Sequence, residues 1–93
     1  MRVNRRRSDI EIIGDILRVG EHGAGKTNIM YNANMSYSQT QKYLGFLMSQ
    51  GYIVKAKVGN PSVTYQATKR GLKLLRGIDN LIEMLGLNGH DKL

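Results

Sequence analysis

The chain has 93 residues, with fourteen Lys and Arg residues against seven Asp and Glu residues and a net charge of +7. This length allows one small domain with a single modest core, and the composition of 41% hydrophobic and 23% charged residues is typical of a globular protein. The absence of cysteine excludes a disulfide framework, a cysteine-ligated zinc finger and thiol catalysis. No apolar run is long enough to span a membrane, so we expect a cytoplasmic protein. The net charge of +7 indicates a polyanionic partner.

The basic residues are concentrated in two parts of the chain. Residues 1–7 contain four arginines, and residues 36–71 contain five basic residues and no acidic residue. A surface of scattered, solvated lysines would include a few acids in a stretch of that length. The distribution therefore favours a nucleic acid as the polyanion.

A first helix is predicted from Ser8 to about Val19. Ser8 and Glu11 have the spacing of a capping box, and the apolar residues that follow recur at helical spacing. Glycines at three positions between residues 20 and 25 then interrupt the helix.

A helix-turn-helix is predicted for residues 27–50. A short helix over 27–33 precedes a three-residue turn, and Ser36 with Gln39 forms a second capping box that opens a longer helix. Gly51 is placed to end that helix as its C′ residue. In this motif the second helix enters the major groove of DNA. The residues expected on its inner face are Tyr37, Thr40, Leu44, Leu47 and Met48.

The outer face of this second helix carries polar side chains and no acid. Glutamine amides can pair with adenine, Lys42 can reach guanine or a phosphate, and serine can bond either. Phe46 is the one large apolar candidate for a protein-binding patch, which keeps a protein-interaction module as an alternative. The residues of this outer face are Ser38, Gln39, Gln41, Lys42, Gly45 and Ser49.

A β-hairpin and a last helix complete the predicted order of elements. Residues 52–54 and 63–67 have strand composition, and a polar connection separates them, so we expect a wing over 55–62 that contacts the DNA backbone. Thr68 can cap a final helix that runs to about Leu85, although Gly77 is expected to interrupt it. The apolar residues of this helix follow the spacing of a short coiled-coil seam, and the alternative is that they only cover the chain's own core.

A second motif points to a different chemistry. Residues 20–27, GEHGAGKT, match the P-loop pattern GxxxxGK[ST] at every fixed position. A working P-loop needs a buried strand before the loop, whereas a capped helix is predicted there. A nucleotide-binding protein is therefore the alternative hypothesis. The two histidines and the scattered acids form no metal site or catalytic triad, so we expect no enzyme, no metal and no cofactor.

The run KTNIMYNANMSYSQTQKYLGFLMSQGYI, followed by a hairpin and YQATKRGLKLL, resembles the small archaeal winged-helix DNA-binding proteins of about ten kilodaltons; this chain has a mass of 10.4 kDa. The family pattern is K-T-x-I-M-Y-x-A-N-L-S-Y in the helix-turn-helix, followed by T-x-K-G at the end of the wing. Residues 8–76 match this pattern along nearly their whole length. The resemblance implies binding to DNA and a dimer joined by an antiparallel coiled coil of C-terminal helices.

Together these observations predict a mainly α protein with a small β-hairpin, a winged helix-turn-helix with a C-terminal dimerisation helix. Its parts are a basic arm (1–7), the DNA-binding domain (8–71) and the last helix and tail (72–93). We expect a homodimer in the nucleoid, acting as a transcriptional regulator or a nucleoid-associated protein. The residues expected to contact double-stranded DNA are Arg5, Arg6, Arg7, Lys26, Thr27, Asn28, Ser38, Gln39, Gln41, Lys42, Ser49, Lys55, Lys57, Asn60 and Ser62. The residues expected in the dimer seam are Leu75, Ile78, Leu81, Ile82 and Leu85.

Overall fold

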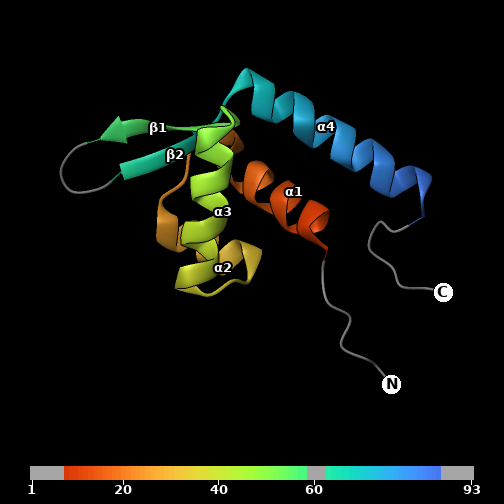
Figure 1. Ribbon diagram of the computed structural model, residues 1–93. Coiled ribbons are helices and arrows are strands. Elements are labelled where there is room, and N and C mark those ends of the chain that lie inside the picture. The colour runs from red at the N-terminus through yellow and green to blue at the C-terminus, as the bar shows by residue number, and fades with distance from the viewer. Residues whose placement is uncertain (1–7, 59–62, 87–93) are drawn as a thin grey trace.

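The computed structural model describes residues 8–58 and 63–86 (Figure 1). The elements follow one another as α1 (Asp9–Val19), the 3₁₀ turn η1 (Gly20–His22), α2 (Lys26–Ala33), α3 (Tyr37–Ser49), β1 (Ile53–Val58), β2 (Val63–Ala67) and α4 (Lys69–Met84). The predicted fold class is confirmed: four α-helices and one hairpin among the described residues. The hairpin projects from one side of the helical body, and α4 extends toward the other side (Figure 1). No helix in the described ranges is long and apolar enough to cross a membrane.

Three of the four α-helices begin with a side-chain cap. Ser8 opens α1 and Ser36 opens α3, both through the predicted capping boxes, and Thr68 caps α4. In contrast, α2 begins after Gly25 with no side-chain cap. The first amide groups of α2 therefore depend on water or a ligand for acceptors.

The core lies where α1, α2, α3 and the two strands meet. Thr40 is the polar residue in it, and its hydroxyl donates a hydrogen bond to the carbonyl oxygen of Ser36 at 2.8 Å. Its burial therefore leaves no unpaired hydroxyl. The largest side chains that are almost completely buried are Ile16, Leu17, Ile29, Leu44, Leu47 and Ile53, together with Thr40.

The wing is an antiparallel pair of strands tied to the rest of the fold at a second point. The register shifts between Lys55 and Lys57, which places a bulge in β1. On the other strand, Tyr65 forms a β-bridge with Ala24, which lies in the connection between η1 and α2. The Ala24 amide donates to Tyr65 at 3.0 Å and the Tyr65 amide donates back at 2.8 Å. This bridge fixes β2 beside the start of α2.

The last helix packs on α1 along its first half. Leu75 and Ile78 are buried there, and Arg18 of α1 forms a bidentate ion pair with Asp79 at 3.0 and 3.1 Å. The hydrogen bond with Asp79 raises the pKa of Arg18 above its ordinary value. The expected interruption at Gly77 is wrong, because α4 runs unbroken from Lys69 to Met84. A glycine costs a helix only about 1 kcal/mol, which packing on α1 can offset.

The end of α3 and the start of α4 meet at a very close contact. A Cβ atom at Gly71 would lie 2.2 Å from the Tyr52 carbonyl oxygen. That same oxygen accepts the Thr68 amide at 3.0 Å, and the Thr68 hydroxyl donates to the Gly51 carbonyl oxygen at 2.7 Å. Only glycine fits at position 71 without moving the backbone.

We expect Gly71→Ala to lower the free energy of unfolding by about 3 kcal/mol, because the added methyl forces two backbone segments apart. Gly77→Ala is the matched control. Nothing lies within 4 Å of a Cβ atom built at Gly77, so alanine there should stabilise the helix by about 0.5–1 kcal/mol. Urea unfolding followed by circular dichroism measures both changes. Equal midpoints for the two variants would contradict the close contact.

Candidate nucleic-acid interface

The helix-turn-helix is built from α2, a tight turn and α3. Asn34 ends α2 in the left-handed conformation (φ 56°, ψ 56°), which asparagine tolerates better than most residues. The Met35 amide donates to the Met30 carbonyl oxygen at 3.0 Å. The turn thereby directs the chain from α2 into α3, and the capping box at Ser36 fixes where α3 begins.

The outer face of α3 is exposed along its whole length and carries no acidic residue. Two of the predicted reading residues are engaged in their own helix. The Gln39 side-chain oxygen accepts the Ser36 amide in the capping box, and the Ser49 hydroxyl donates to the Phe46 carbonyl oxygen at 2.8 Å. Ser38 and Lys42 are exposed, so their polar groups are directly accessible to a base edge or a phosphate.

Lys26 joins the start of α2 to the outer face of α3. Its ammonium donates a hydrogen bond to the Gln41 side-chain oxygen and lies 5.2 Å from the centre of the Tyr37 ring. The expectation that Tyr37 lies on the inner face is therefore wrong, since 57% of its surface is exposed. Tyr37 is the first residue of α3 and lies beyond the edge of the core, where the Lys26 side chain covers its ring.

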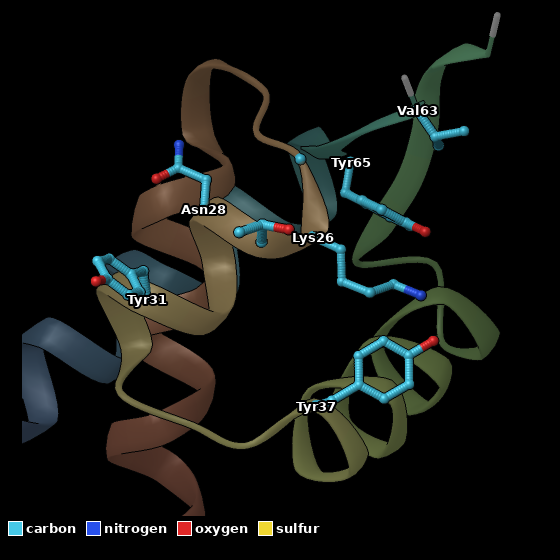
Figure 2. A pocket seen from close by; sticks show the side chains of 8 residues that line it. Lys26, Asn28, Tyr31, Tyr37, Val63 and Tyr65 are labelled. Carbon is cyan, nitrogen blue, oxygen red and sulfur yellow. The ribbon is translucent and has the colours of Figure 1, made fainter. Parts of the chain in front are cut away.

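A pocket of about 1030 Å³ opens between α2, the start of α3 and strand β2 (Figure 2). The strand contributes Val63 and Tyr65, which the sequence analysis assigned only to a strand of the hairpin. The hydroxyl of Tyr65, the ammonium of Lys26 and the hydroxyl of Tyr37 point to the same side of the pocket (Figure 2). The residues that line it are Gly25, Lys26, Thr27, Asn28, Tyr31, Tyr37, Val63 and Tyr65.

Arg70 holds the opposite end of α3. Its guanidinium lies 4.7 Å from the centre of the Tyr52 ring, and its Nε donates to the Gln50 carbonyl oxygen at 3.0 Å. A cation beside the last carbonyls of a helix is favourable. Arg70 therefore stabilises the C-terminal end of α3 from the first turn of α4, although it belongs to the acid-free basic stretch.

The wing residues predicted to contact DNA are described only in part. Lys55 is exposed on β1. Lys57 lies in β1 opposite Thr64, and its side chain is outside the described part of the structure. The predicted contacts Arg5, Arg6, Arg7, Asn60 and Ser62 lie entirely outside the described residues.

The P-loop alternative fails on geometry. The element before GEHGAGKT is the helix α1 followed by η1, where a P-loop needs a buried strand. The glycines instead make a 3₁₀ turn, with Gly23 at φ 88°, and the β-bridge of Ala24. Within the described ranges, no group of three or more His, Asp or Glu residues could hold a metal ion.

The predicted dimer seam divides into two halves. Leu75 and Ile78 are buried against the chain's own core, and a Cβ atom at Gly14 of α1 would lie 3.1 Å from Ile78. Farther along, Ile82 is half-buried, and Leu81 and Leu85 are exposed. An intermolecular contact through α4 is therefore available only to its last turns, where Met84 is exposed as well.

A helix-turn-helix followed by a two-stranded wing defines the winged-helix class. Residues 6–86 match the family described as winged helix-turn-helix, and the chain belongs to this family. A protein of Methanocaldococcus jannaschii of uncharacterized function is 38% identical over 85 residues, which cover 88% of this chain and 82% of that protein.

Solved structures show the same architecture. The crystal structure of Sso10a-2, a DNA-binding protein from Sulfolobus solfataricus, matches with a TM-score of 0.80 and 34% identity over 86% of this chain and 83% of that one. Wild-type ZitR of Lactococcus lactis in complex with DNA matches with a TM-score of 0.67 and 13% identity over 87% of this chain and 57% of that one. At this identity the second match concerns the fold alone.

We expect Arg70→Ala to lower the free energy of unfolding by about 1 kcal/mol, because it removes the ring contact and the hydrogen bond to α3. Amide exchange at the end of α3 should become faster in this variant. Lys69→Ala removes the same charge from an exposed neighbour and is the control. Hydrogen exchange followed by NMR measures the effect, and equal exchange in the two variants would show that Arg70 does not hold α3.

Proposed function

We propose that the protein binds double-stranded DNA, with α3 in the major groove and the hairpin across the sugar–phosphate backbone. The observation that carries this proposal is the outer face of α3, which is exposed, free of acids and polar apart from Phe46. Phosphate repels acidic side chains, so a surface without them over thirteen helical residues fits a polyanion. Membership of the winged helix-turn-helix family and the similarity to a DNA-binding protein support it.

Base reading is assigned to α3. Lys42 and Ser38 are the accessible side chains, and Gln41 can join them when its oxygen is released from Lys26. Each good contact between such a side chain and a base edge discriminates by about 1–3 kcal/mol.

Contacts to the backbone are assigned to the elements on either side of α3. The start of α2 supplies Lys26, Thr27 and Asn28, whose amides face outward at the positive end of the helix dipole. Lys55 and Lys57 of the wing and the arginines of the N-terminal arm add positive charge. Such contacts fix the position of the protein on the duplex and carry no sequence information.

The protein acts as a homodimer in this proposal. The apolar side chains of Leu81, Met84 and Leu85 are exposed on consecutive turns at the end of α4, as a helix requires when it packs against a second copy. Two copies would present two recognition helices to one duplex. The proposal also places the protein in the nucleoid, as a regulator or an architectural protein.

Binding titrations at two salt concentrations test this function. We expect Lys42→Ala to cost about 1–3 kcal/mol on the preferred duplex and less on random duplexes. Replacing Lys55 and Lys57 together by alanine should weaken binding to all duplexes alike, and the salt slope should fall by about one for each lost phosphate contact.

The wild-type titration also separates the two roles. A regulator binds its preferred site far more tightly than random DNA, whereas an architectural protein shows almost no preference. Loss of specificity in the wing variant, with none in the α3 variant, would reverse the two assignments. Wild-type protein that binds no duplex would refute the function.

A substitution at the end of α4 tests the dimer. Leu85 is 61% exposed, so Leu85→Asp should leave the fold intact, place a charge in the apolar contact and weaken the dimer by about tenfold or more. Asn80→Asp adds the same charge at an exposed polar position of α4 and should change little. Sedimentation equilibrium measures both. A wild-type monomer at high micromolar concentration would contradict the proposed dimer.

A further inference from the structure

The Tyr65 side chain combines a buried ring with a hydroxyl that has no protein partner. Only 7% of the residue surface is exposed, and the ring belongs to the core cluster. Within the described ranges its hydroxyl makes no hydrogen bond with another residue, and it points into the pocket beside α2 (Figure 2). Among the described residues no buried side-chain polar atom lacks a partner, so this hydroxyl is accessible from the pocket and is free to donate a hydrogen bond to a ligand there.

The start of α2 supplies further donors to the same pocket. Its N-cap residue is Gly25, which offers no side-chain acceptor, and its first turn contains no acid. The amides of Thr27 and Asn28 therefore lack acceptors within the helix, at the end where the helix dipole is positive. Both residues line the pocket.

The polar groups around the pocket select the class of ligand. The ammonium of Lys26 lies 5.2 Å from the centre of the Tyr37 ring. Both side chains point to the same side of the pocket as the Tyr65 hydroxyl (Figure 2), and no Asp or Glu lines the pocket. Amides and an ammonium can only donate, and donors from three elements that line one pocket suit an anion with several oxygens. Phosphate has this chemistry.

We propose that this pocket binds one phosphate group of the duplex backbone, with the Tyr65 hydroxyl as the donor from the wing and Lys26 and the α2 amides as the donors from the helix. The inference rests on the proposed DNA binding and adds Tyr65 and Tyr37 to the interface. The pocket lies between the start of α3 and strand β2, so a duplex that contacts both elements passes over it. In this proposal Gly25, Lys26 and Thr27, the last residues of the P-loop-like sequence, bind a phosphate of DNA, although the segment does not have the fold of a P-loop.

The substitution Tyr65→Phe tests the hydroxyl alone, because the ring that packs in the core is kept. We expect it to weaken binding to every duplex by about tenfold, the size of a hydrogen bond to a charged group. The salt slope should stay unchanged, since no charge is lost, whereas Lys26→Met should lower the slope by about one. Tyr52→Phe, whose hydroxyl lies at the other end of α3 beside Arg70, is the control and should bind like the wild type.

Duplexes with single neutral methylphosphonates show whether the hydroxyl touches a phosphate. In the wild type, neutralising the phosphate in the pocket should weaken binding markedly. The same change should cost Tyr65→Phe much less, because the contact is already lost. If each methylphosphonate weakened Tyr65→Phe by the same factor as the wild type at every phosphate position, the hydroxyl would contact no phosphate, and the proposal would be overturned. A Tyr65→Phe variant that binds duplexes like the wild type would also overturn it.

A titration with inorganic phosphate, followed by the amide NMR signals of Thr27 and Asn28, separates this proposal from the proposed function. Signals that shift in the wild type, and shift less in Tyr65→Phe, support the phosphate pocket. If they do so while the wild type binds no duplex, the pocket takes free phosphate and the proposed DNA binding fails. If the signals stay fixed but the duplex experiments succeed, the source is the duplex phosphate. If neither phosphate nor duplex binding depends on Tyr65, the pocket is not a phosphate site.

Discussion

The junction between α3 and α4 is the contact on which the arrangement of this protein depends. At Gly71 the first turn of α4 lies directly against the Tyr52 carbonyl group, and Thr68 and Arg70 bond the last carbonyls of the segment that leaves α3. Residue 71 has no room for a side chain, so the distance between the two helices has little freedom. The strand β1 starts from the same point, at Ile53. One junction therefore sets the directions of the proposed recognition helix, the wing and the last helix.

Much of the fold could be predicted because its signals are local. The capping boxes at Ser8 and Ser36 mark two helix starts within one residue, and Gly51 with φ 80° ends α3 as a C′ glycine should. The strand composition of residues 63–67 matches β2. These features depend on residues within four positions of one another, which a sequence displays directly.

The remaining features depend on residues that are distant in the sequence. The bridge between Ala24 and Tyr65 joins two segments forty-one positions apart, and no periodicity indicates it. The apolar face of α4 was visible from its spacing, but spacing does not reveal which neighbour covers it; α1 covers Leu75 and Ile78. Most of the proposed DNA contacts follow from charge and exposure. Tyr65 was missed because its ring has the pattern of a core residue, and only its hydroxyl reaches the pocket.

The hydrogen bond between Lys26 and Gln41 has a consequence for the order of events on a duplex. In the free protein the Lys26 ammonium donates to the Gln41 oxygen, so Lys26 sets the orientation of the amide that would pair with adenine. In the proposed complex, a phosphate near the start of α2 would compete for the same ammonium and release that oxygen. Contact with the DNA backbone would then come before recognition of the bases. In such a mechanism the protein moves along DNA with the Gln41 amide held by Lys26. The amide becomes free to pair with a base only where a phosphate takes over the Lys26 ammonium.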